Sequence, residues 1–199
     1  MKTVFIDIHT HNLEAPAGQA VINLPDAVFA DAPFPRRQGA SYSVGIHPMY
    51  PGDWQKAFTA VTAMAEQPDI AAVGECGLDK LSPIPMEIQS EYFVKHLQLA
   101  DELKKPLIIH CVRAWDELLQ ALRTVPSVAP RIVHAFRGKP QQAEQLLRAG
   151  LHLSFGPRFN PDSLRLCPSD KRHAETDDSG LSIETVIQSH REALETIPH

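Results

Sequence analysis

Imidazole and carboxylate side chains recur in this chain where short apolar runs end. His9 and His11 close the stretch FIDIHTHN, and Glu75, His110, His134 and Asp177 each follow a separate candidate strand. Side chains two positions apart on a strand point to the same face, about 7 Å apart, so His9 and His11 can converge on one ion. A lone His at a strand end is more often structural, and Glu75 or Asp177 could simply cap a helix. Six such residues at strand ends together favour a metal site.

A scaffold that gathers several strand ends is needed to bring these side chains together. Apolar runs predict strands over the following segments: Thr3–Ile8, Ala20–Asn23, Tyr42–Ile46, Ile70–Gly74, Pro106–Ile109, Arg131–Val133, Leu151–Phe155 and Arg172–Thr176. Helical periodicity predicts helices over another set: Asp53–Glu66, Met86–Leu103, Ala114–Thr124, Pro140–Ala149 and Ser182–Glu195.

Alternation of strands and helices implies a parallel sheet with helices outside it. Eight candidate strands predict an α/β fold, a compact (β/α)₈ TIM-like barrel that forms one domain over residues 1–199. We expect helices to be missing after strands 1, 2 and 7, and the polar eighth strand is the weakest of the set. Active sites of such barrels lie at the C-terminal ends of the strands, where the six residues fall.

Composition narrows the class of protein. The 199 residues are 43% hydrophobic and 22% charged, with a net charge of −5 at pH 7, which argues against loose, charge-driven binding to nucleic acid or anionic membranes. A polyanionic substrate held by metal ions stays possible, because bound cations reverse the local field. Three cysteines without a CxxC spacing, no signal-peptide pattern and no apolar stretch long enough to span a membrane predict a cytoplasmic protein.

Six segments together are similar to a known family. IDIHTH, VGIHP, VGECGLD, PLIIHCVRA, IVHAFRG and ETDD resemble the motifs of the TatD family of metal-dependent hydrolases, amidohydrolase-like TIM barrels. The resemblance implies two divalent ions. His9, His11, Glu75 and Asp177 would hold the first ion. Glu75 would bridge to the second, which His110 and His134 would also hold.

Ligand chemistry leaves the metal open. A set of His and carboxylate groups suits Zn²⁺, Mn²⁺ or Mg²⁺. Cys76 and Cys111 directly follow proposed ligands, so strand alternation should point both thiols away from the ions. A bound ion would lower the pKa of a water nucleophile. Asp177 could accept the proton of that water or act only as a ligand, and we place Asp177 and Glu75 as the catalytic pair.

A phosphate substrate also needs donors. We expect these to be His47 in GIHP and three strand-end arginines, Arg113, Arg137 and Arg158, although a surface ion pair is the commoner fate of an arginine. The chain departs from the family pattern at Ala135-Phe136-Arg137-Gly138, at Lys80 after GLD, and at Asp178-Ser179-Gly180 after ETD. These changes bear on substrate choice more than on metal binding.

A metal-dependent phosphodiesterase, specifically a deoxyribonuclease, is the function that this pattern favours, with DNA or another phosphodiester as the partner. One alternative is an amidohydrolase that cleaves a C–N or ester bond on the same scaffold. The other is a barrel that binds metal without turnover, which the weak eighth strand and the altered loop after Asp177 would suit.

Overall fold

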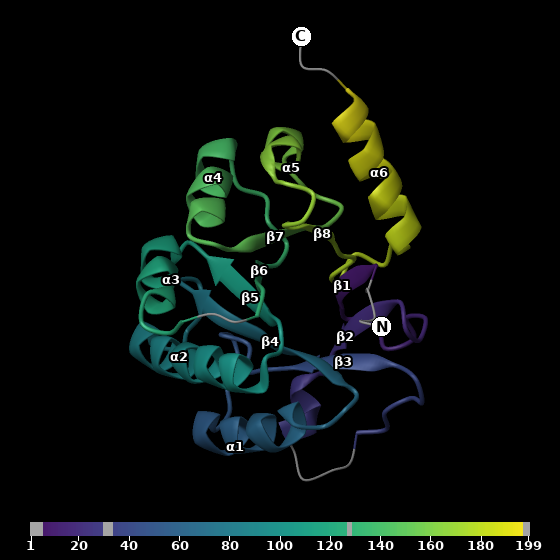
Figure 1. The fold of residues 1–199 in the computed structure, drawn as a ribbon. Coiled ribbons are helices and arrows are strands. Elements are labelled where there is room, and N and C mark those ends of the chain that lie inside the picture. The colour runs from purple at the N-terminus through teal and green to yellow at the C-terminus, as the bar shows by residue number, and fades with distance from the viewer. Residues whose placement is uncertain (1–5, 30–33, 127–128, 197–199) are drawn as a thin grey trace.

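Eight parallel strands form one sheet in the computed structural model, which describes residues 6–29, 34–126 and 129–196. The strands pair in chain order: β1 (Asp7–Thr10), β2 (Ala20–Asn23), β3 (Ser41–Val44), β4 (Ile70–Asp79), β5 (Leu107–Val112), β6 (Arg131–Val133), β7 (His152–Phe155) and β8 (Arg172–Ala174). An isolated parallel bridge from Thr10 to Asp177 joins the two ends of this order. The sheet thus closes nearly completely into the barrel that the sequence predicts (Figure 1).

Helices cover the outside of the barrel (Figure 1). They are α1 (Trp54–Ala65), α2 (Met86–Leu103), α3 (Trp115–Leu122), α4 (Pro140–Arg148), α5 (Pro161–Leu166) and α6 (Ile183–Glu195), with a 3-10 helix, η1 (Asp26–Phe29), after β2. Side-chain caps start several of them: Asp53 accepts the Lys56 N–H of α1, and Ser182 accepts the Thr185 N–H of α6.

The expectation that no helix follows the seventh strand is wrong. Helix α5 occupies that position, and Asn160 caps it by accepting the N–H groups of Asp162 and Ser163. Pro161 stands at the first helical position, where its missing N–H costs nothing. The segment after β1 contains only turns, and the segment after β2 forms no helix but η1 within its described residues, 24–29 and 34–40, as the absence of an apolar helical period predicts.

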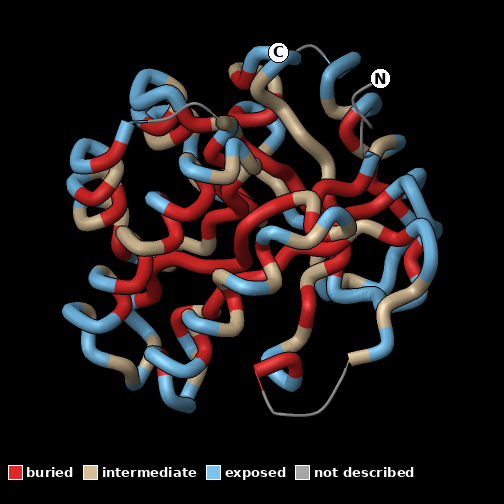
Figure 2. Tube along the Cα trace, turned by 60° about the horizontal axis from the view of Figure 1, so that its bottom comes forward, coloured by how far each residue is buried: buried red, intermediate tan, exposed pale blue. Residues whose placement is uncertain are grey.

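The buried hydrophobic residues of the strands fall into two separate clusters. Val73, Leu107 and Ile109 lie in the main core with helix residues such as Leu97 and Leu118, whereas Val21, Ala72 and Ile108 form a small cluster of their own. Figure 2 shows the strands buried at the centre and exposed residues on the surrounding helices. No helix in the described ranges is long and apolar enough to cross a membrane.

Six strands have different bounds from those predicted, and three of them, β1, β4 and β5, end later in the chain than expected. Residues 1–5 lie outside the described chain, and β1 extends to Thr10, so His9 is part of the strand. Strands β4 and β5 also continue past Gly74 and Ile109, because their pairing runs on from Cys76 opposite Ile109 to Asp79 opposite Val112. Glu75 and His110 therefore lie within strands rather than after them, which fixes their directions more firmly than a loop would.

Candidate metal centre

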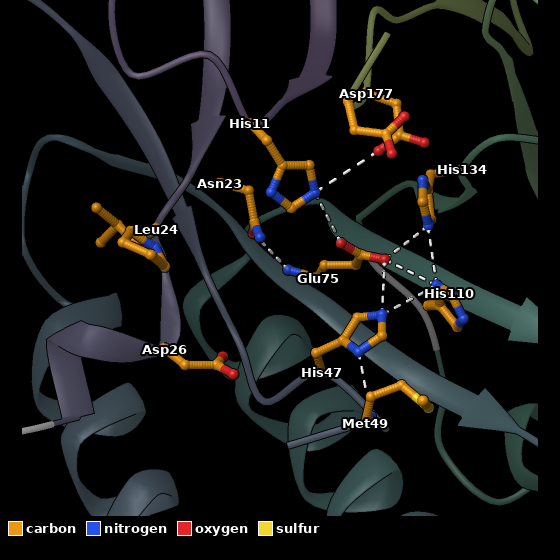
Figure 3. A pocket seen from close by; sticks show the side chains of 12 residues that line it. His11, Asn23, Leu24, Asp26, His47, Met49, Glu75, His110, His134 and Asp177 are labelled. Carbon is orange, nitrogen blue, oxygen red and sulfur yellow. Dashed lines mark hydrogen bonds and ion pairs between the residues drawn. The ribbon is translucent and has the colours of Figure 1, made fainter. Parts of the chain in front are cut away.

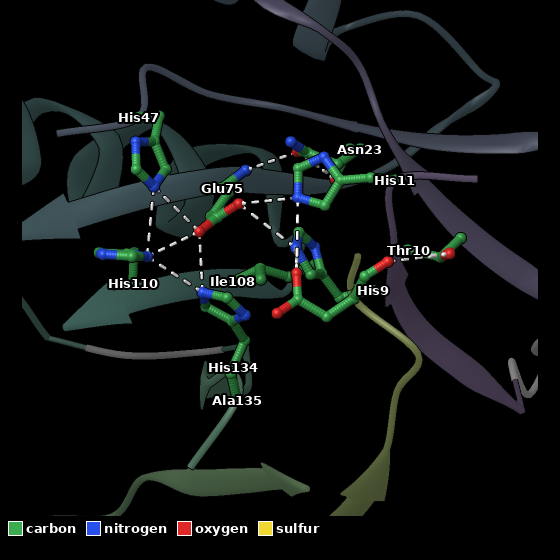
Figure 4. A network of polar contacts seen from close by, with 12 residues as sticks. His9, Thr10, His11, Asn23, His47, Glu75, Ile108, His110, His134 and Ala135 are labelled. Atoms are coloured by element: carbon green, nitrogen blue, oxygen red, sulfur yellow. Dashed lines mark hydrogen bonds and ion pairs between the residues drawn. The ribbon is translucent and has the colours of Figure 1, made fainter. Parts of the chain in front are cut away.

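Glu75 lies at the middle of a ring of histidines at the C-terminal end of the barrel (Figure 4). Its Oε1 is 2.8 Å from His110 Nδ1 and 2.8 Å from His134 Nε2. Its Oε2 is 3.3 Å from His9 Nε2 and 3.4 Å from His11 Nε2. The two carboxylate oxygens therefore face two different sets of imidazoles.

Asp177 lies on the same side of Glu75 as His9 and His11. Its Oδ1 is 3.7 Å from His9 Nε2 and 3.6 Å from His11 Nε2. Backbone hydrogen bonds fix this position, since Asp177 N–H donates to the His9 carbonyl and His11 N–H donates to the Asp177 carbonyl, each at 3.0 Å. The structure thus brings all six predicted ligand residues together, in the two groups that the family resemblance implies.

Donor atoms and burial fit divalent ions. The ligand atoms of His9, His11 and Asp177 lie within 4.8 Å of one another, as do those of His9, Glu75 and His134. His9 is fully buried, its Nδ1 has no hydrogen-bond partner among the described residues, and its Nε2 faces the carboxylates of Glu75 and Asp177 without a hydrogen bond to either. A buried imidazole without hydrogen bonds is costly unless it binds something else. Nitrogen and carboxylate donors suit Zn²⁺ and Mn²⁺.

Charge is concentrated between Glu75 and the rings. Burial would raise the pKa of the Glu75 carboxyl, but His134, His11 and His110 hold it well below its usual range. Burial opposes the charge of His134 as well, yet Glu75 and Glu175 hold the pKa of that ring well above its usual range. The cluster therefore favours an ionised Glu75, the form that binds cations.

His47 joins the cluster in a different role. Its Nε2 is 3.3 Å from Glu75 Oε1 and 3.2 Å from His110 Nδ1, while its Nδ1 accepts the Met49 N–H at 3.1 Å. A neutral imidazole has one lone pair and one N–H. Because the lone pair of His47 is used at Nδ1, its Nε2 carries hydrogen and points into the site as a donor (Figure 3).

Two cavities adjoin the cluster, and His110, His134 and Asp177 line both of them. One, of about 510 Å³, is lined by His11, Asp26, His47 and Met49. The other, of about 420 Å³, is lined by His110, His134 and two of the predicted arginines, Arg113 and Arg137. The third, Arg158, lines a smaller cavity beside it, of about 190 Å³, together with Arg137 and Asp177. All three arginines therefore line cavities that adjoin the cluster.

Sequence reasoning missed the residues that support the cluster. Asn23 Oδ1 accepts the Glu75 N–H at 2.9 Å, and Asp79 and Glu175 contact His110 and His134 from behind. Asp79 stands in the motif VGECGLD with Glu75, and Glu175 stands in the motif ETDD with Asp177. Their closeness in sequence to proposed ligands is the signal by which both could have been found. Cys76 is buried in the main core, and burial raises its pKa well above the ordinary value for a thiol.

Several known proteins are similar to this chain in sequence. The family model described as TatD related DNase matches residues 35–179. A protein of Erwinia billingiae named 3'-5' ssDNA/RNA exonuclease TatD is 34% identical over 71% of this chain and 59% of its own length. A protein of the same name from Rahnella sp. is 30% identical over 79% of this chain and 65% of its own length.

Among solved structures, a TatD homologue from Escherichia coli aligns with a TM-score of 0.71 at 22% identity, over 100% of each chain, and it supports the barrel fold. The chain spans about three fifths of the length of curated relatives such as the Erwinia protein. The family model covers most of the chain, and its match includes Glu75, His110, His134 and Asp177. The chain therefore belongs to the TatD related DNase family.

Proposed function

We propose that this chain is a metal-dependent hydrolase that cleaves phosphodiester bonds of nucleic acid, with deoxyribonuclease activity. One observation carries the proposal: the two oxygens of the buried Glu75 carboxylate face two separate sets of imidazoles, His9 with His11 and His110 with His134. A bridging carboxylate of this kind is typical of two-metal sites, which stabilise the attacking and leaving oxygens of a displacement at phosphorus. The exonuclease names of the relatives support a nucleic acid substrate.

Two divalent ions, each Zn²⁺, Mn²⁺ or Mg²⁺, would be held by His9, His11 and Asp177 on one side of Glu75 and by His110 and His134 on the other. When bound, they would supply a water of lowered pKa and positive charge opposite the phosphate. Asp177, whose side chain is 18% exposed at the edge of the cluster, is placed to accept the proton of the attacking water.

Substrate contacts would come from the donors around the cluster. The Nε2–H of His47 points toward Glu75 Oε1 and is placed to donate to a phosphoryl oxygen. Arg113, Arg137 and Arg158 line two cavities that adjoin the cluster, where their guanidinium groups would contact further phosphates of a polynucleotide. The free cysteines Cys76, Cys111 and Cys167 support a reducing location, the cytoplasm.

A substrate panel tests this proposal. The protein is stripped of metal, reloaded with Mn²⁺, Zn²⁺ or Mg²⁺, and assayed on single-stranded DNA, single-stranded RNA, and p-nitrophenyl phosphodiester, ester and amide compounds. We expect turnover on DNA and on the phosphodiester that depends on added ion and is lost in Glu75→Gln. Turnover confined to the amide or ester would favour the amidohydrolase alternative, and a metal-loaded protein inert on every substrate would favour the non-catalytic one.

A further inference from the structure

The cavity of about 510 Å³ beside the cluster differs in charge from the two smaller ones. Arg113 and Arg137 line the cavity of about 420 Å³, and Arg137 and Arg158 line the cavity of about 190 Å³. The described residues that line the largest cavity include no lysine or arginine, and two of them, Asp26 and Asp178, are carboxylates outside the proposed ligand set. Phosphate groups are therefore attracted to the smaller cavities and disfavoured in the largest one.

Asp26 begins η1, and its carboxylate points into the largest cavity (Figure 3). The backbone around Asp26 is fixed, because the Val28 N–H donates to the Pro25 carbonyl at 3.0 Å and both Val28 and Phe29 are buried in the main core. The carboxylate itself makes no hydrogen bond within the described chain. Both of its oxygens are thus free to accept hydrogen bonds from a ligand.

The largest cavity also has an apolar wall, formed by Leu24, Pro25 and Met49. The Met49 side chain is 44% exposed, and a methionine thioether makes favourable contacts with aromatic rings. A volume of about 510 Å³ is within the range of about 300–1,000 Å³ that is usual for small-molecule sites. A nucleobase with its sugar suits these walls, whereas the charged phosphates of a longer chain do not.

A phosphodiester held at the cluster would place the nucleosides on its two sides in different cavities, because His110, His134 and Asp177 line both the largest cavity and the one of about 420 Å³. A strand that continues through the smaller of these meets Arg113 and Arg137. A strand that continued through the largest cavity would bring its next phosphate toward the Asp26 carboxylate. The nucleoside in the largest cavity is therefore the last of its strand.

We propose that the largest cavity binds the terminal nucleoside of a nucleic acid strand, and that Asp26 selects strands that end in a free hydroxyl over strands that end in a phosphate. This inference rests on the function proposed above and specifies which strand ends that function accepts. An ionised carboxylate can only accept hydrogen bonds, and a terminal hydroxyl can donate one. A terminal phosphate carries a charge of about −1.5 to −2 at pH 7, so the Asp26 carboxylate repels it.

End preference of the Mn²⁺-loaded protein tests the proposal. Single-stranded DNA of one sequence is prepared with hydroxyls at both ends, with a phosphate at the 3′ end only, and with a phosphate at the 5′ end only. Removal of the first nucleotide is followed in mildly alkaline buffer, where the Asp26 carboxyl is ionised.

A phosphate on the end from which nucleotides are removed should lower kcat/KM by about 10–100-fold, the effect of losing one hydrogen bond to a charged group. A phosphate on the other end should change kcat/KM little. The difference should shrink at high salt, because Asp26 is exposed and its charge is screened there. Equal kcat/KM for all three strands would overturn the proposal.

Two variants separate the charge of Asp26 from its shape. Asp26→Asn keeps the size and an acceptor oxygen but removes the charge, so phosphate-ended strands should gain about tenfold relative to hydroxyl-ended ones. Asp26→Lys should reverse the preference. Glu102→Gln is the matched control, because it removes a charge from an exposed position of α2 that lines none of the three cavities, and it should keep the wild-type ratio. A purely structural role of Asp26 predicts that both kinds of strand lose activity in parallel, and an unchanged ratio would refute the selection.

Binding distinguishes a failure of this inference from a failure of the proposed function. Short phosphorothioate strands, whose linkages resist cleavage, are titrated with the Mn²⁺-loaded wild type and Asp26→Asn. Hydroxyl-ended strands should bind the wild type about 10–100-fold more tightly than phosphate-ended ones, and the variant should show a smaller difference. A protein that shows this difference but cleaves no nucleic acid would refute the proposed function and retain the end selection. A protein that cleaves DNA but binds both kinds of strand equally would do the reverse.

Discussion

At the scale of single residues, Glu75 bears on both halves of the proposed metal centre, whereas His134 belongs to one half. Glu75→Gln keeps the size of the side chain but removes its charge and one anionic oxygen. We expect both ions to bind more weakly and turnover on a phosphodiester to fall by orders of magnitude. His134→Ala should mainly weaken the ion on its own side, so excess Mn²⁺ should restore the His134 variant better than the Glu75 variant.

Metal content and phosphodiester turnover, followed across Mn²⁺ concentration for the wild type and the two variants, check this expectation. Cys76→Ser is a suitable control, because Cys76 is the neighbour of Glu75 in sequence but is not a proposed ligand. Its thiol is buried in the core, where Sγ lies 3.8 Å from the Ile108 carbonyl oxygen. Near-normal turnover in Glu75→Gln with both ions still bound would rule out the bridging role.

His96 supports the site from a distance and makes stability depend on pH. Its Nε2 accepts the N–H of Ile46 at 3.1 Å, and Ile46 directly precedes His47 of the cluster in the sequence. Its Nδ1 lies 2.7 Å from the Tyr92 carbonyl oxygen. Burial lowers its pKa from 6.5 to about 4, although the Tyr92 carbonyl favours the charged form. Since the unfolded chain binds this proton more tightly, stability should fall as pH drops from about 6.5 toward 4, by about 3 kcal/mol in all.

Urea unfolding of the wild type and His96→Gln across that pH range measures this contribution. The variant has no group to titrate there, so the wild type should lose free energy of unfolding more steeply with acid than the variant does. His173, whose pKa is also lowered to about 4 by burial and by His152, titrates in both proteins and cancels in the comparison. Parallel pH curves for the two proteins would contradict the assignment of this slope to His96.

At the scale of elements, close contact between Gly45, which follows β3, and strand β4 fixes the direction of Glu75. A Cβ added at Gly45 would lie 2.6 Å from the Gly74 Cα and 2.8 Å from the Glu75 carbonyl oxygen, both backbone atoms that cannot move aside cheaply. Gly45→Ala should therefore push the strands apart and cost about 1–3 kcal/mol of stability. It should also reduce metal content, because Glu75 would shift.

Gly156→Ala is the matched control for that variant. An added Cβ there would meet Glu175 atoms at 3.8 Å, an ordinary contact distance, so the free energy of unfolding should change by no more than about 1 kcal/mol. Thermal unfolding and metal analysis of both variants provide the measurement. Equal melting temperatures for Gly45→Ala and the wild type would show that the two strands can separate without cost.

Element periodicity explains which parts of the fold could be predicted from the sequence. The long period of α2 and the Val- and Ile-rich runs of β4 and β5 determine their own conformation, so these elements were predicted. Helix α5 was missed because its six residues are too few to show a period, and only the Asn160-Pro161 start announces it. The C-terminal end of β4 was predicted too early, because pairing with β5, a contact distant in sequence, carries the strand through Glu75 to Asp79.

The residues of the candidate site could likewise be predicted only in part from the sequence. The six proposed ligands could be found because each follows an apolar run and matches a motif. Asp79, Glu175 and Asn23 act through hydrogen bonds whose partners lie on other strands, and no spacing in the sequence expresses such contacts. The tautomer of each histidine depends on which of its nitrogens meets the partner, so it emerges only from the folded geometry.

At the scale of the whole molecule, the junction between β1 and β8 is where the barrel is held by the least backbone pairing. In the described chain a single bridge, Thr10 to Asp177, links the two strand ends. Side chains reinforce it: the Thr176 hydroxyl donates to Asp7 Oδ2 at 2.6 Å and lies 2.8 Å from the Thr10 hydroxyl. Burial raises the pKa of Asp7 to about 6, so keeping the Asp7 carboxylate ionised at this junction costs free energy.

A bound ion should strengthen this junction. His9 and His11 belong to the β1 end and Asp177 follows β8, so an ion held by all three would connect the two edges of the sheet. An ion that binds only the folded, closed form stabilises it by mass action, and the effect should be largest where local opening separates the ligands. We therefore expect a chelator to lower the melting temperature and to speed hydrogen exchange most at residues 7–11 and 172–178.

Hydrogen–deuterium exchange of the metal-loaded and metal-stripped protein tests this expectation, with β3 as an internal reference, since residues 41–44 contain none of the proposed ligands. Thr10→Val provides the matched variant: it removes the hydroxyl that faces Thr176 but no ligand, so it should speed exchange at the junction even with metal bound. Protection that is unchanged by metal, or gained equally in β3, would mean that the ion does not connect β1 to β8. In that case His9, His11 and Asp177 could not hold one ion together.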